Sequence, residues 1–193
     1  MAYQRTHNLF GSSFCGVVAR QYWADLALWE LFLNAHQDIK TIIELGAFHG
    51  GMTLFLACQA RARDLGFYSL DRDWPGAAMD TPLAVALDLK DVFTLGDFWE
   101  DRKAGAIAER PLLLVQTPAL KPLLLFVDGG CKRDEFKAFV PQLEPGDYVG
   151  VHDYKTEFRP EDVEPVLHLL EPVFWDECLA PPQPCLTRFW RRV

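Results

Sequence analysis

Five acidic residues stand at the ends of five apolar segments of this 193-residue chain: Glu44, Asp71, Asp97, Asp128 and Asp153. In open parallel sheets, ligands bind outside the carboxyl ends of the strands, so we expect these side chains to face one cleft. Carboxylates attract cations and accept hydrogen bonds from hydroxyl groups, whereas they repel phosphates. The pattern therefore favours a ligand that is positively charged and rich in hydroxyls.

A glycine turn follows the first of these segments, in IIELGAFHGG (residues 42–51). Its glycines are Gly46, Gly50 and Gly51, so the sequence has neither the G-x-G-x-x-G of dinucleotide-binding turns nor the Gly-Lys-Ser/Thr ending of phosphate-binding loops. S-adenosylmethionine carries a sulfonium, an ammonium and ribose hydroxyls, and it has no phosphate. The turn and the acids together favour it as the cofactor.

Strand-like and helix-like segments alternate along the chain and position these residues. We predict strands at 41–45, 67–71, 92–97, 123–128, 148–154, 172–179 and 185–193, and helices at 21–36, 53–64, 99–109, 133–143 and 161–170. Residues 74–88 are expected to form a loop that becomes helical, and residues 110–122, with three prolines, to be irregular. The predicted fold class is α/β. It is a Rossmann-like, doubly wound, mainly parallel sheet of seven strands, with an antiparallel C-terminal strand and helices on both faces. We expect one domain over residues 1–193, with residues 1–40 as an N-terminal helical segment packed on the core.

Composition limits the partners. The chain has 27 acidic and 19 basic residues and a formal net charge of -8, which disfavours nucleic-acid binding. Its five cysteines form no CxxC pair, and we see no signal peptide and no apolar run of about 18 residues. We therefore expect a cytoplasmic protein with a small-molecule substrate and no membrane contact. The apolar N-terminal helix leaves a homodimer open.

The motifs resemble those of the class I S-adenosylmethionine-dependent methyltransferases. ELGAFHGG is similar to their first motif, SLDRD to the acidic end of their second strand, and LGDF to the loop after their third. FVDGGCKRDEF followed by LEPGDYVGVHDY resembles the branch that contains the cephalosporin-hydroxylase-like and macrocin-type O-methyltransferases. The resemblance covers about residues 20 to 193.

This resemblance implies a site for the amino-acid moiety of the cofactor at the glycine turn. Gly46, Ala47, Gly50 and Gly51 would let the backbone approach that moiety. Glu44 would stabilise the region from beneath, and a purely structural role for this buried acid is the alternative.

The resemblance also implies roles for the acids that follow. Asp71 would accept the ribose hydroxyls, Arg72 would flank the adenosine, and Asp97 would take the adenine amino group, with Phe98 against the ring. The alternative for Asp71 and Asp97 is a helix-capping or turn role. Asp128 is expected to orient the cofactor end of the pocket.

Transfer of the methyl group to oxygen needs a base or a metal that acidifies the hydroxyl. Asp128 and Asp153 are predicted to share a divalent cation, most plausibly Mg²⁺, as in related O-methyltransferases. The alternative is that Asp128 only orients the cofactor end of the pocket while Asp153 caps a loop. His152 is expected to act with Asp128 as base or supporting partner. Because side chains alternate along a strand, His152 should face away from Asp153.

The sequence departs from the family pattern after the fourth strand. Many relatives read Asp-Gly-x-His there, and Cys131 stands where that histidine base would be. The connection to the next helix is also about one turn shorter, and we expect Lys132 and Arg133 on the solvated first turn of that helix. The main prediction is O-methylation of a small-molecule or sugar hydroxyl. The alternatives are a non-catalytic binding protein on a methyltransferase fold and a dinucleotide-dependent oxidoreductase.

Overall fold

A seven-stranded sheet forms the centre of the computed structural model, which describes residues 12–73, 75–101, 103–176 and 185–193. Its strand order is β10-β11-β9-β8-β3-β4-β5. The strands are β3 (Thr41–Leu45), β4 (Gly66–Asp71), β5 (Phe93–Leu95), β8 (Leu123–Val127), β9 (Tyr148–Val151), β10 (Leu170–Val173) and β11 (Arg188–Arg192). Strands β5, β4, β3, β8 and β9 are parallel, and β11 runs antiparallel to both β9 and β10. The predicted fold class is confirmed.

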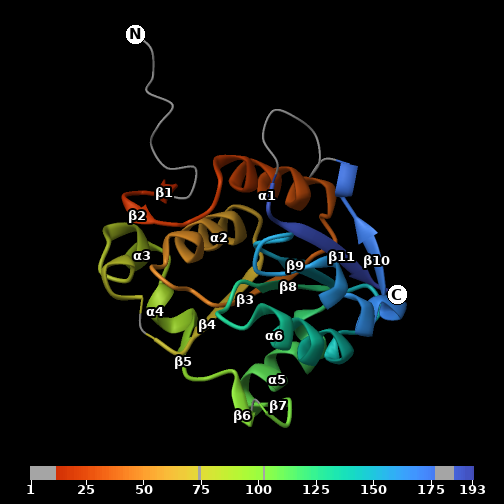
Figure 1. The fold of residues 1–193 in the computed structure, drawn as a ribbon. Coiled ribbons are helices and arrows are strands. Elements are labelled where there is room, and N and C mark those ends of the chain that lie inside the picture. Colours follow the sequence, from red (N-terminus) through yellow and green to blue (C-terminus); the bar gives the residue numbers. More distant parts are fainter. Residues whose placement is uncertain (1–11, 74, 102, 177–184) are drawn as a thin grey trace.

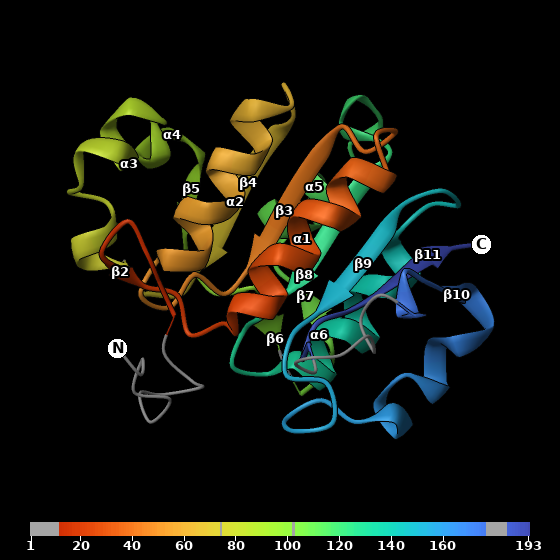
Figure 2. The same ribbon diagram turned by 90° about the horizontal axis from the view of Figure 1, so that it is seen from above.

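Helices cover both faces of this sheet (Figures 1 and 2). Helices α1 (Trp23–Ala35) and α2 (Gly51–Ala62) lie on one face, and α5 (Glu109–Gln116) and α6 (Lys132–Phe139) lie on the other. Because β3 and β8 are buried on both faces, both are apolar apart from Thr41 and Glu44 of β3. On α1, apolar residues at helical spacing turn inward, and Trp29 packs edge-on against Phe126 of β8 with ring centroids 4.8 Å apart.

The remaining elements are short. They are β1 (Ser13–Phe14), β2 (Val17–Val18), β6 (Trp99–Asp101), β7 (Ala106–Ile107), α3 (Pro82–Ala86), α4 (Leu89–Val92), and the 3₁₀ segments η1 (Gly76–Ala78), η2 (Pro118–Leu120), η3 (Val140–Gln142), η4 (Pro160–Asp162) and η5 (Glu164–Leu169). The predicted helix near 161–170 is thus two 3₁₀ segments. The predicted final strands shorten to β10 and β11, and residues 177–179 lie outside the described part of the chain. Within that part, no helix is both long and apolar enough to cross a membrane.

Two predictions for the segment between β5 and β8 are wrong. The predicted helix at 99–109 is the antiparallel β6–β7 hairpin, because the Asp101 carboxylate accepts hydrogen bonds from the turn N–H groups of Lys103 and Ala104, and Gly105 adopts a φ of 71°. Residues 110–122 are not irregular throughout, because α5 occupies the first part. Pro111 is the third residue of that helix, where its missing N–H leaves no helical hydrogen bond unmade.

Candidate functional site

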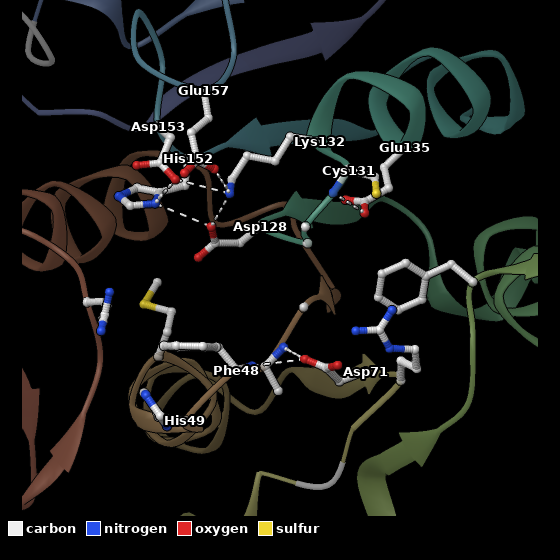
Figure 3. A pocket seen from close by; sticks show the side chains of 18 of the residues that line it. Phe48, His49, Asp71, Asp128, Cys131, Lys132, Glu135, His152, Asp153 and Glu157 are labelled. Atoms are coloured by element: carbon white, nitrogen blue, oxygen red, sulfur yellow. Dashed lines mark hydrogen bonds and ion pairs between the residues drawn. The ribbon is translucent and has the colours of Figure 1, made fainter. Parts of the chain in front are cut away.

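A cavity of about 880 Å³ opens at the carboxyl ends of the parallel strands. It lies at the switch point of the sheet, where the chain order runs outward from β3 through β4 to β5 and from β8 to β9 in the opposite direction. Of the predicted site residues, the walls contain Gly46, Ala47, Asp71, Arg72, Asp97, Phe98, Asp128, His152 and Asp153. Glu44, Gly50 and Gly51 are not among the lining residues. Figure 3 shows the two opposite walls of this cavity.

The first wall is the glycine loop, residues 46–51, together with Asp71. Gly46 has a φ of +95°, and a Cβ there would lie 2.6 Å from the backbone of Asp128 and Gly129. The Asp71 carboxylate accepts hydrogen bonds from the N–H groups of Ala47 (2.6 Å) and Phe48 (2.9 Å) through one oxygen. The loop N–H groups that a pyrophosphate would need are therefore already bonded to a carboxylate.

Gly50 and Gly51 shape this wall from outside the cavity. Gly50 has a φ of +81°, and a Cβ on it would lie 2.3 Å from the Cβ of Ala78. A Cβ on Gly51 would lie 2.5 Å from the backbone of Val18, in the β1–β2 hairpin. Both glycines allow neighbouring segments to pack closely on the start of α2. They therefore shape the loop and do not line the cavity themselves.

Glu44 lies beneath the loop, fully buried. Its Oε2 accepts hydrogen bonds from the hydroxyls of Thr53 (2.7 Å) and Ser69 (2.5 Å). Burial is the main reason that the pKa of Glu44 is raised to about 8, and the nearby Asp128 and Asp71 raise it further, against the two hydroxyl hydrogen bonds. Glu44 thus supports the floor of the site in a largely protonated form at neutral pH.

Asp97, Phe98 and Arg72 lie at the far end of the first wall. Phe98 is buried, and the Asp97 carboxylate accepts a hydrogen bond from the N–H of Trp99 (3.1 Å), which fixes the turn after β5. Arg72 is largely exposed and pairs with Asp73 at 3.3 Å. All three predicted residues line the cavity as expected from their positions after β4 and β5.

The second wall carries a cluster of charged side chains, which we call the lysine cluster: Asp128, Lys132, His152, Asp153 and Glu157. Lys132 is the first residue of α6, and its side chain is only 8% exposed. Its Nζ lies 3.4 Å from an oxygen of Asp128, 3.0 Å from Asp153 and 3.1 Å from Glu157 (Figure 3). The prediction of a solvated Lys132 is wrong, because the short loop after β8 returns this side chain to the strand end.

The same cluster overturns the expected orientation of His152. Strand β9 ends at Val151 and Asp153 has a φ of +60°, so the alternation of side chains no longer holds there. His152 is buried, and its Nδ1 lies 3.3 Å from a carboxylate oxygen of both Asp128 and Asp153. Burial alone would lower the pKa of His152, but the two carboxylates outweigh it and raise the pKa to about 10. Asp153 shows the reverse effect. Its burial alone would raise its pKa, but the positive charges of His152 and Lys132 outweigh burial and lower the pKa to about 2.

Two further residues of the cavity were not predicted. Gln21, from the segment before α1, donates a 2.8 Å hydrogen bond from Nε2 to the second oxygen of Asp128. Glu135 is buried against Gly129 and accepts a hydrogen bond from the N–H of Cys131 (3.2 Å), and burial raises its pKa to about 7. No pattern in the sequence marks Gln21 as a residue of the site.

The sheet order, the cavity at its switch point and the acids around it define a Rossmann-like methyltransferase fold. No protein-family model matches the sequence, and no curated protein sequence matches it. Several solved structures, by contrast, have a similar fold. A structure of CmcI with Mg and S-adenosylmethionine is 20% identical with a TM-score of 0.64, over 94% of this chain and 76% of CmcI. One of CmcI with S-adenosylhomocysteine is 19% identical with a TM-score of 0.61, over 97% of this chain and 85% of CmcI.

A third solved structure widens the comparison. CalS11, a TDP-rhamnose 3'-O-methyltransferase, is 17% identical with a TM-score of 0.57, over 86% of this chain and 78% of CalS11. At these identities the likeness establishes the fold. It confirms the class I methyltransferase fold that the predicted resemblance implies.

Proposed function

We propose that this protein is an S-adenosylmethionine-dependent methyltransferase. The observation that carries the proposal is the Asp71 carboxylate bonded to the N–H groups of Ala47 and Phe48. A dinucleotide pyrophosphate would meet a negative charge at this loop instead of free N–H donors. The Asp71 carboxylate can instead attract a cationic centre and accept hydrogen bonds from ribose hydroxyls. The alternative of a dinucleotide-dependent oxidoreductase is therefore disfavoured.

The cavity supports a cofactor placed along the first wall. Gly46 and Ala47 would hold the amino-acid moiety, Asp71 would accept hydrogen bonds from the ribose hydroxyls, and Asp97 and Phe98 would hold the adenine; all five line the cavity. A cavity of about 880 Å³ is at the upper end of the range for small-molecule sites, so a small acceptor fits beside the cofactor.

The second wall would act on the acceptor hydroxyl. The oxygen attacks the methyl carbon, the C–S bond breaks with its electrons going to sulfur, and S-adenosylhomocysteine leaves. The positive charges of Lys132 and His152 stabilise the oxygen as it loses its proton, which Asp128 accepts and passes to water. His152 is held protonated between two carboxylates, so its proposed role is a fixed positive charge and not a base.

Calorimetric titration tests the cofactor assignment. We expect micromolar binding of S-adenosylhomocysteine and no heat with NAD. Absence of binding of S-adenosylhomocysteine would overturn the proposal, and a heat with NAD would favour an oxidoreductase. Binding of S-adenosylmethionine without turnover across a panel of small hydroxyl compounds would favour the non-catalytic alternative.

The proposal extends to the partners of the chain. Trp23 and Leu31 on α1 are 65% and 55% exposed, which supports the predicted homodimer through this helix. The cytoplasmic location, the absence of nucleic-acid binding and the single domain stay predictions from the sequence.

A further inference from the structure

The second wall contains the donor set that a divalent cation needs. Asp128, His152 and Asp153 each offer one ligand atom, and these atoms lie within 4.8 Å of one another. Carboxylate oxygens are the ligands that Mg²⁺ prefers, and the sequence predicted a cation at this place. By ligand type alone these residues fit a metal. Whether a metal can bind therefore depends on what fills the space between them.

That space is already occupied by the Lys132 ammonium. Its Nζ lies 3.4 Å from Asp128 and 3.0 Å from Asp153, through the carboxylate oxygens that also face His152. A magnesium ion binds carboxylate oxygens at about 2.1 Å, so an ion on these oxygens would lie within a few ångströms of Nζ. Two like charges at that separation repel strongly in a buried setting.

Contacts on several sides hold this ammonium at the two carboxylates. Lys132 begins α6 only four residues after Asp128, and its side chain is 8% exposed. On its other side, the turn after Asp153 places Glu157 3.1 Å from Nζ. That turn is closed by the carbonyl of Asp153, which accepts hydrogen bonds from the N–H groups of Thr156, Glu157 and Phe158.

We propose that Lys132 takes the place of a divalent cation in this site, so that its second wall works without a metal. The side chain supplies a fixed positive charge between Asp128 and Asp153 and holds both carboxylates in position. Its role in methyl transfer rests on the proposed function, whereas the exclusion of a metal rests on the cluster alone. The chain thus departs from the metal-assisted chemistry that its resemblance implies.

Manganese binding tests this exclusion directly, by electron paramagnetic resonance on the full chain without cofactor. Wild-type protein should bind no Mn²⁺ at this site up to millimolar concentration. Lys132→Met keeps the apolar stem and removes the charge. This variant should gain a site that binds Mn²⁺ at least about tenfold more tightly than that millimolar limit. Lys132→Arg, which keeps the charge, should gain none. Lys137→Met, on an exposed position of α6, is the matched control and should behave as wild type.

A second substitution locates the gained site. Asp153→Asn in the Lys132→Met background should abolish the Mn²⁺ binding that Lys132→Met gained. Lys132→Gln replaces Lys132→Met if the latter does not fold, because the amide can still donate to the carboxylates. The proposal is overturned if wild type binds Mn²⁺ and Asp153→Asn removes that binding, or if the folded neutral variants gain no site. Since no cofactor is present, a failure of the methyltransferase assignment would leave this result unaffected.

Discussion

The two walls of the cavity stabilise their carboxylates in different ways. On the first wall, Asp71 accepts hydrogen bonds from backbone N–H groups of the glycine loop. On the second wall, Asp128 and Asp153 are paired with the side chains of Lys132 and His152. Backbone donors leave a carboxylate with its negative charge and free lone pairs for a ligand, whereas side-chain cations cancel the charge. The first wall is therefore suited to bind a cationic cofactor, and the second to act on a neutral acceptor.

Asp71→Ala should have the largest effect on this comparison. The substitution removes the proposed ribose acceptor and also leaves two loop N–H groups without their partner. Hydrogen bonds to a charged group contribute about 1.5–3 kcal/mol, so the affinity for S-adenosylhomocysteine should fall about 100-fold. Calorimetric titration measures it. Asp91→Ala, at an exposed position of α4 that does not line the cavity, is the control and should bind as wild type.

An Asp71→Ala variant that binds within a few-fold of wild type would contradict the assignment of the first wall to the cofactor. If the Lys132 variants lost cofactor binding instead, the roles of the two walls would be reversed.

Gly46→Ala should have the next largest effect, this time on stability. The new Cβ would lie 2.6 Å from the backbone of Asp128 and Gly129, at a φ of +95° that L residues adopt at a cost. The free energy of unfolding, measured in urea, should fall by about 2 kcal/mol or more. Gly130→Ala on the second wall is the matched control, since a Cβ there has no neighbour within 4 Å. Equal stabilities of the two variants would show that the packing of Gly46 against the backbone after β8 does not constrain the glycine loop.

The same contrast explains what the sequence could predict. Strand ends and the glycine turn are marked by local patterns, so the sequence predicts that Asp71 and Asp97 face the cleft, and both line the cavity. The lysine cluster depends on where α6 begins and on the positive φ of Asp153. Neither feature has a residue signature, because Asp153 is not a glycine and no capping residue marks the start of α6. The helix predicted at 99–109 failed for a related reason, since a turn closed by Asp101 overrides a weak helical pattern.

Glu44→Gln should separate the two walls by their dependence on pH. In the folded state the pKa of Glu44 is raised from 4.5 to about 8. Between these values the folded protein keeps a proton that the unfolded chain has released, so stability falls as the pH rises through this window and levels off above it. Glutamine keeps an oxygen for the hydroxyls of Thr53 and Ser69 and does not titrate.

The variant should therefore lose less stability than wild type between pH 5 and 8, by up to about 1.4 kcal/mol for each pH unit, in urea unfolding at a series of pH values. The pair formed by His152 titrates in a higher window, because its pKa is raised from 6.5 to about 10 and its contribution is lost as the pH rises through that value. The wild-type and Glu44→Gln profiles should thus differ in slope between pH 5 and 8 and run parallel above pH 8. Parallel profiles over the whole range would mean that Glu44 is ionised in the folded protein, and the floor of the first wall would then carry a charge available to the cofactor ammonium.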